Sequence, residues 1–188
     1  MINNKSFTLI EILVAVTIFS LVVAAGSGIF ISSISGQQKS LAFQKVLSES
    51  SYVMEYVSRS LRMAQKDDIE INGVTKNCLS GDKVNYEITP SGKGIKFRNY
   101  KNECQEFYLD TSAKQLKESK DEVENYLTSE KLEVLAFNIN LLGQSQEDSK
   151  QPRVTIFLDI KTRGQRAQTQ YEMKIQTTIS QRNLDVKR

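Results

Sequence analysis

The stretch KSFTLIEILVAVTIF, residues 5–19, decides the fold of the N-terminal part of this 188-residue chain. It carries one carboxylate, Glu11, at the start of a run with no charged residue from Ile12 to Gln38. An α-helix rises about 1.5 Å per residue, so this run exceeds the roughly 20 residues that cross a hydrocarbon core of about 30 Å. The sequence therefore predicts a membrane-spanning helix.

Two simple interpretations of this helix are a secretory signal peptide cut near residues 24–26 and a plain signal anchor. Neither accounts for Glu11, because an acidic side chain in hydrocarbon costs several kcal/mol unless it lies near the interface, is neutralised or is paired. Lys5 is the only charged side chain ahead of Glu11, and this weak basic bias predicts a cytoplasmic N-terminus. Glu11 is therefore a candidate functional residue.

Residues 7–11 read Phe-Thr-Leu-Ile-Glu and lead directly into the apolar run. This segment resembles the class III signal of type IV pilins and pseudopilins. In that family a short basic leader ends in a small residue, usually glycine, before a phenylalanine, and a glutamate occupies the fifth mature position. Ser6 stands where glycine is usual but keeps a small side chain. The motif and its helix cover about the first third of the chain.

The resemblance implies cleavage between Ser6 and Phe7 on the cytoplasmic face by a membrane aspartic prepilin peptidase, followed by methylation of the Phe7 amine. Glu11 is retained and neutralises that amine, within one helix or on a neighbour in a filament, where a misplaced subunit would leave two unpaired ions. The implied partners are other pilin or pseudopilin subunits, the prepilin peptidase/methyltransferase and the inner membrane. The implied localisation is a single pass of the inner membrane, with the C-terminal domain outside, and then an extracytoplasmic filament.

The apolar residues between Leu41 and Ala64 recur three and four apart and predict that the helix continues as an amphipathic segment. We expect a leader at 1–6, a transmembrane and assembly helix at 7–36, an amphipathic continuation at 37–66 and a β-rich extracytoplasmic domain at 67–188. The expected fold class is α+β, with a long N-terminal helix packed on a mainly antiparallel sheet.

Short runs rich in β-branched and aromatic residues predict the strands of the C-terminal domain. The expected strands are 69–71, 84–89, 95–100, 106–109, 132–142, 154–162 and 170–180. Residues 90–94, with two glycines, predict a hairpin turn, and 163–169 a basic loop between the last two antiparallel strands. Residues 112–125 and 143–152 are polar and aperiodic, so we expect exposed loops, with room for a helical turn in the first.

The composition argues against several chemical functions. The chain has no histidine, which is the commonest general base near neutral pH and a frequent metal ligand. No nucleophile elbow, phosphate loop or metal-ligand spacing is present, so we expect neither an enzyme nor a cofactor or metal. The rival interpretation is a membrane-anchored or secreted enzyme or receptor ectodomain whose carboxylates converge only in space.

Nucleic-acid binding is a weaker alternative. The formal charge of +3 predicts no strong field for nucleic acid. Arg163 and Arg166 mark a basic loop of the kind that contacts DNA phosphates in a DNA-uptake pilin-like protein, but without interleaved aromatic residues a solvated turn is the better interpretation. DNA is therefore an unlikely partner.

The two cysteines, Cys78 and Cys104, flank the expected hairpin. A disulfide between them would contribute roughly 3–4 kcal/mol in the chain-entropy model, and the alternative is two free buried thiols. The extracytoplasmic location that the resemblance implies favours the disulfide.

The resemblance also predicts a biological role. It favours a structural minor subunit of a type IV pilus, a type II secretion pseudopilus or a related filament. The closing TTISQRN, residues 177–183, is similar to the ends of minor pseudopilins. The retained Glu11 argues against the tip-most pseudopilin, which typically lacks this glutamate.

Overall fold

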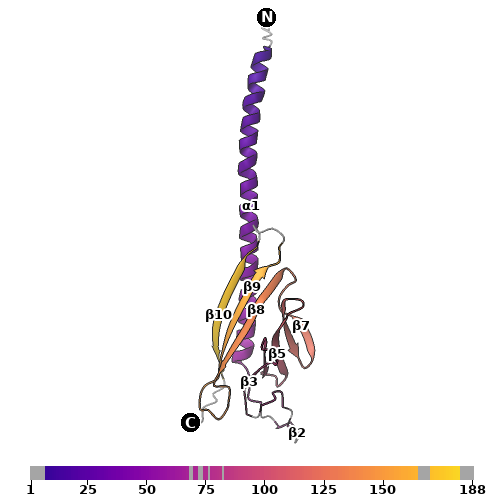
Figure 1. The fold of residues 1–188 in the computed structure, drawn as a ribbon, viewed down its shortest axis with the longest axis vertical. Helices are drawn as coiled ribbons and strands as arrows, with labels where there is room; N and C mark the ends of the chain where they lie inside the picture. The colour runs from indigo at the N-terminus through magenta and orange to yellow at the C-terminus, as the bar shows by residue number, and fades with distance from the viewer. Residues whose placement is uncertain are drawn as a thin grey trace. The chain divides into compact units, whose positions relative to one another are not determined.

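The computed structural model describes residues 7–67, 70–71, 74–75, 77–81, 83–164 and 170–182. The chain divides into two compact units, Met1–Leu41 and Ala42–Arg188, and each is described by itself. The element α1 (Leu9–Arg62) is one 54-residue α-helix that belongs to both units and is followed by β-strands (Figure 1). The predicted α+β fold class and the single long helix are confirmed.

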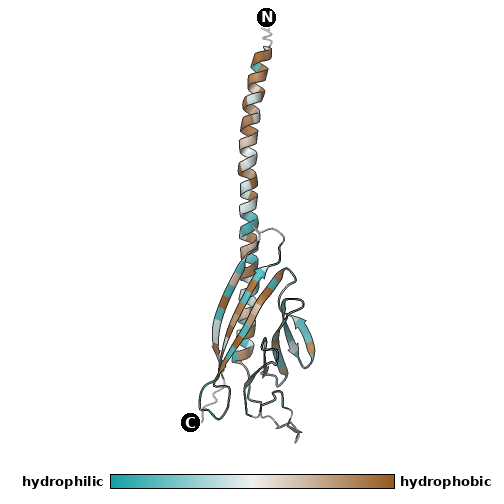
Figure 2. Ribbon diagram, viewed as in Figure 1, coloured by the Kyte–Doolittle hydropathy of each residue, from teal (hydrophilic) through white to brown (hydrophobic). Residues whose placement is uncertain are grey.

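The N-terminal part of α1 carries apolar side chains around its whole circumference (Figure 2). Every residue from Phe7 to Ile34 is exposed within the chain. Its most apolar 18-residue window has a mean hydropathy of 2.5, and α1 is the one described helix long and apolar enough to cross a membrane. An all-round apolar helix with no intramolecular cover is suited to lipid or to other helices.

The C-terminal part of α1 is amphipathic and belongs to the second unit. Its buried residues recur every three or four positions and lie on one face: Val46, Ser50, Val53, Met54, Val57 and Leu61. Their apolar members join one hydrophobic core with the inward side chains of the strands. The predicted packing of this segment on a sheet is confirmed.

The last three strands form an antiparallel sheet in the order β10-β9-β8. Their bounds are β8 (Leu132–Leu142), β9 (Arg153–Thr162) and β10 (Glu172–Ser180). The inner face of β9 is fully buried through Val154, Ile156, Leu158 and Ile160. The pairing of β9 with β10 was predicted, whereas the pairing of β8 with β9 and the bulge in β8 between Val134 and Ala136 were not.

The middle of the chain forms a five-stranded antiparallel meander in the order β3-β4-β5-β6-β7. Its strands are β3 (Tyr86–Ile88), β4 (Gly94–Arg98), β5 (Cys104–Asp110), β6 (Gln115–Lys120) and β7 (Val123–Tyr126). A two-stranded ladder joins β1 (Glu70–Ile71) and β2 (Val74–Thr75). The predicted 90–94 hairpin is confirmed, with Gly92 at φ 69°.

Gly94 opens β4 where the backbone passes close to β5. A Cβ atom at this position would lie 2.8 Å from the carbonyl oxygen of Phe107 and 2.7 Å from the Cβ of Tyr108. Only glycine fits this close approach without a shift of backbone atoms.

The segment 112–125 was predicted to be an exposed loop with a possible helical turn, and this prediction is wrong. It contains β6 and the start of β7, joined by a tight turn in which Asp121 and Glu122 both have positive φ, 43° and 73°. Such a turn is usually marked by glycine. The sequence of β6 does not show the apolar alternation of a strand, because one of its buried residues is the charged Glu118. The carboxylate of Glu118 is hydrogen-bonded inside the fold. Residues 143–152 form the predicted loop, apart from a bridge from Ser145 to Val84.

Candidate functional site

The candidate site is the N-terminal segment that carries Phe7 and Glu11. Phe7 precedes α1 and its side chain is 75% exposed. Glu11 lies in the first turn of α1. Ser6, the other residue of the predicted cleavage site, lies outside the described residues, so cleavage and methylation remain predictions.

Thr8 forms the N-cap of α1. Its Oγ1 accepts a hydrogen bond from the backbone N–H of Glu11 at 3.4 Å, and its carbonyl accepts one from the N–H of Ile12 at 3.3 Å. A threonine followed three residues later by glutamate has the spacing of a capping box. The carboxylate of Glu11 therefore has a local role as well, because a negative charge in the first turn is favourable for the helix dipole. This signal was readable from the sequence and was missed.

The spacing between Phe7 and Glu11 is four residues, which is about one helical turn. A charged amine released at Phe7 and the carboxylate of Glu11 would therefore lie one turn apart if the helix extended to Phe7. The same carboxylate is exposed in the isolated chain and is open to a charge from a neighbouring molecule.

Four hydroxyl groups within the apolar part of α1 bond to the backbone of the helix itself. The side chains of Thr17, Ser20, Ser27 and Ser35 each donate to a backbone carbonyl three or four residues earlier, at 2.8–3.0 Å. These hydroxyls therefore need no water, which lowers the cost of placing the segment in lipid or between helices. Gly26, Gly28 and Gly36 leave open space at their Cβ positions, where another helix can approach closely.

The predicted disulfide is present between Cys78 and Cys104, whose Cα atoms lie 5.4 Å apart. Beside it is a buried ion pair that the sequence did not predict. The Nη2 atom of Arg98 lies 2.6 Å from Oδ1 of Asp67, and both side chains are almost fully buried. The Asp67 carboxylate also accepts hydrogen bonds from the backbone N–H groups of Cys78 and Leu79, at 3.0 and 2.6 Å.

A cavity of about 810 Å³ lies between the C-terminal part of α1 and the β5–β7 side of the meander. At its wall, Tyr56 donates a hydrogen bond to Glu118 and accepts one from Lys120, both at 2.7 Å. Burial raises the pKa of Tyr56. In the described ranges, no three histidine, cysteine, aspartate or glutamate side chains form a group that could hold a metal ion.

The basic loop after β9 is described only in part. Arg163 donates from its guanidinium to the carbonyl of Ala113 and from its backbone N–H to the carbonyl of Lys131, both at 2.8 Å. These bonds fasten the end of β9 to neighbouring loops and give Arg163 a structural role. Arg166 lies outside the described residues.

Comparison with known families finds one similarity. Residues 1–27 match the family model described as the prokaryotic N-terminal methylation motif. No curated protein and no solved structure matches the chain. The matched residues include Phe7 and Glu11, and the match ends within the apolar part of α1. It therefore characterises the N-terminal segment alone, which is consistent with membrane anchoring.

Proposed function

We propose that the chain is a structural minor subunit of a type IV pilus, a type II secretion pseudopilus or a related filament. The observation that carries this proposal is the N-terminal methylation motif at the start of an exposed apolar helix. That helix continues without a break into a segment buried against antiparallel strands. The same helix thus carries an uncovered apolar surface and a folded domain, as an assembly subunit requires.

The proposed maturation begins with removal of residues 1–6 by cleavage between Ser6 and Phe7. The new amine of Phe7 is then methylated. Residues 7–36 act as the transmembrane and assembly helix, residues 37–66 as its amphipathic continuation, and residues 67–188 as the extracytoplasmic domain. Before assembly the subunit crosses the inner membrane once, with its N-terminus in the cytoplasm.

The proposed role of Glu11 follows from the cost of burying charge. The amine of mature Phe7 is a cation at the start of an apolar helix, and an unpaired ion there costs several kcal/mol. The exposed Glu11 carboxylate of an incoming subunit would compensate the Phe7 amine of a neighbour. A subunit in the wrong register would leave both ions unpaired, so this pair sets the position of the subunit along the filament.

The proposed partners are other pilin or pseudopilin subunits and the prepilin peptidase/methyltransferase. The role is structural and not enzymatic. The position of Arg163 argues for a structural role and against DNA binding, because its guanidinium donates a hydrogen bond to the carbonyl of Ala113.

The N-terminus of protein extracted from membranes tests the proposal directly by mass spectrometry. We expect a chain that begins at Phe7 and carries one methyl group on its amine. A chain that begins near Gly26 would instead show cleavage by signal peptidase and would overturn the proposal in favour of a secreted enzyme or receptor.

A further inference from the structure

Strand β10 is a nine-residue strand at one edge of the three-stranded sheet, and the longer β8 forms the opposite edge. Strand β10 pairs with β9 over nine residues, Glu172 to Ser180, without a bulge, and no described strand pairs with its other side (Figure 1). A free edge presents a row of backbone N–H and C=O groups that can pair with another strand.

The bonds at the two ends of the β9–β10 ladder show which groups face outward. The N–H of Thr162 donates to the carbonyl of Tyr171, and the N–H of Gln181 donates to the carbonyl of Pro152. In an antiparallel pair, alternate residues bond to the partner, so the odd-numbered residues of β10 face β9. The even-numbered residues therefore face the free edge.

These even-numbered residues are Glu172, Lys174, Gln176, Thr178 and Ser180, and all five are exposed. Each carries one N–H and one C=O, so ten backbone groups face outward. Among the described residues, none of these ten groups has a hydrogen-bond partner. An extended backbone presents the complementary row of donors and acceptors.

The other sheet edges are short, bulged or bonded at one end: β3 has three residues, and β8 has a bulge between Val134 and Ala136. At the edge of β3, the N–H of Asn85 donates to the carbonyl of Gln144 at 3.0 Å. At the edge of β8, the N–H of Val134 donates to the carbonyl of Lys114 at 2.8 Å. The edge strand β7 has only four residues. Strand β10 has no bulge, proline or glycine, and its charged residues lie at one end, so from Ile175 to Ser180 it lacks the usual protection against pairing.

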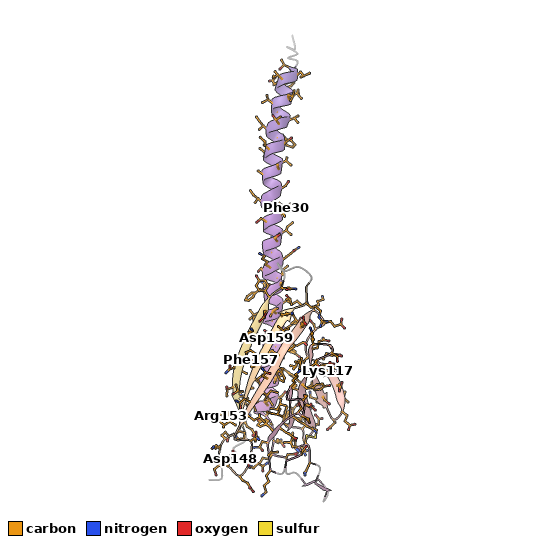
Figure 3. All side chains as sticks on the ribbon, in the orientation of Figure 1. Phe30, Lys117, Asp148, Arg153, Phe157 and Asp159 are labelled. Carbon is orange, nitrogen blue, oxygen red and sulfur yellow. A yellow bond between two sulfur atoms is a disulfide. The ribbon has the colours of Figure 1, made fainter. Side chains whose placement is uncertain are left out.

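The charges beside this edge lie at one end of the strand. The Nζ of Lys174 lies 2.9 Å from Glu172 and 3.7 Å from Oδ2 of Asp159, which is labelled on β9 in Figure 3. A strand added to β10 would meet Lys174 and Glu172 at this end and only neutral side chains beyond them. On the inner face it would contact the partly buried Met173 and Ile175.

We propose that the β10 edge binds an extended segment of a neighbouring subunit by antiparallel strand addition. This inference rests on the proposed function, which supplies the neighbour. The segment carries an acidic residue opposite Lys174 and a basic residue opposite Glu172. Opposite Gln176, Thr178 and Ser180 its residues are uncharged. At the alternate positions, which continue the inner face of the sheet, its residues are apolar. Backbone bonds give affinity, and the charged end sets the register.

A synthetic peptide, Thr-Val-Thr-Val-Thr-Val-Glu-Val-Lys, serves as the probe for full-length chain in detergent micelles. In the antiparallel register its lysine lies opposite Glu172 and its glutamate opposite Lys174. N-methylation of its valines blocks only the edge that faces away from β10 and prevents the peptide from stacking on itself. N-methylation of its threonines and glutamate instead blocks the edge that faces β10. We expect the second peptide to bind at least about tenfold more weakly, and equal binding would overturn the proposal.

The matched variants are Gln176→Pro and Gln176→Thr. Proline at an even position removes an outward N–H and leaves the bonds to β9 intact, so the fold should survive. Slow hydrogen exchange at Met173, Ile175 and Thr177 verifies this in both variants. We expect Gln176→Pro to lose peptide binding and Gln176→Thr to retain it. Binding retained by the folded proline variant would contradict strand addition.

Hydrogen exchange in the native assembly is the final test. We expect the amides of Lys174, Gln176 and Thr178 to exchange fast in the purified chain and at least about tenfold more slowly in the assembly extracted from membranes. Unchanged exchange would overturn the proposal. If these amides became protected as the concentration of the purified chain alone increased, the strand bound at the β10 edge would come from a second copy of this chain. That result would also overturn the proposal. The methyl group on Phe7, measured in the same sample, tests the proposed function separately.

Discussion

The two parts of α1 use the same secondary structure in different ways. Before Leu41, the helix exposes its apolar side chains, and four of its hydroxyls bond to its own backbone. After Ala42, the helix buries one apolar face against strands and pairs its polar side chains with residues far away in sequence. The first part thus leaves its apolar surface uncovered within the chain, whereas the second uses it for the fold of its own domain. Substitutions in the two parts should therefore have different consequences.

The largest effect that we expect is the loss of assembly in Glu11→Gln. The substitution keeps the size of the side chain but removes the charge that would compensate the Phe7 amine of a neighbour. Membrane insertion and cleavage should persist, because burial of a neutral amide costs less than burial of an ion. Recovery of assembly partners relative to the amount of processed chain measures the effect.

Normal partner recovery with Glu11→Gln would remove the charge-pair mechanism. Loss of the processed chain itself would place the action of Glu11 earlier, at cleavage. The thermal unfolding of the second unit should not change, and this is the internal control.

In the second unit, the strongest destabilisation should follow Asp67→Ala. The substitution leaves the Arg98 guanidinium buried without its carboxylate and removes the acceptor for two backbone N–H groups. Loss of one partner of a buried ion pair costs about 3–5 kcal/mol. Denaturant unfolding measures this cost. In the control Glu147→Ala, loss of the exposed pair with Lys83 should cost about 0–1 kcal/mol.

Reduction of the disulfide should lower the free energy of unfolding by about 3–4 kcal/mol in the chain-entropy model. The bond closes a loop with a sequence separation of 26 residues. Denaturant unfolding with and without reductant measures the change. The double variant Cys78→Ala/Cys104→Ala should match the reduced chain and no longer respond to reductant. A large response of the double variant to reductant would show an effect unrelated to this bond.

A smaller and more direct comparison uses one substitution in both parts of the chain. Ile156→Val removes a methylene group from a fully buried side chain and should cost about 0.5–1.5 kcal/mol. Ile18→Val removes the same group from a side chain that is 58% exposed within the chain and should leave the unfolding of the second unit unchanged. Thermal unfolding of both variants in the same detergent tests this. Equal destabilisation would contradict the division of α1.

The smallest effect is a pH dependence at Glu133. The ammonium groups of Lys114 and Lys161 hold the pKa of Glu133 below its ordinary value of 4.5. A carboxyl group with a lowered pKa stabilises the folded state above its unfolded pKa, and this stabilisation is lost as the pH falls through the folded pKa. The unfolding midpoint should therefore decrease below pH 4.5, and Glu133→Gln should make that decrease shallower. An identical slope in the variant would exclude this contribution.

The sequence by itself determined the elements whose signals are local. The uncharged run after Glu11 predicted the exposed helix, and apolar spacing of three and four predicted its continuation. The glycines at 92 and 94 predicted the β3–β4 hairpin, and two long β-branched runs predicted the pairing of β9 with β10. These patterns could be read because each depends on neighbours within a few residues along the chain.

Only the tertiary structure decided the polar interior and the free sheet edge. Strand β6 looks like a loop because its Glu118 is buried by bonds to Tyr56, which lies 62 residues earlier, and Asp67 is paired with Arg98 across 31 residues. The sequence around a charged residue does not indicate that the residue is buried, because its burial depends on a partner that the fold brings to it. The free edge of β10 was hidden for a related reason: the order of strands in a sheet is set by packing, and periodicity within one strand does not encode it.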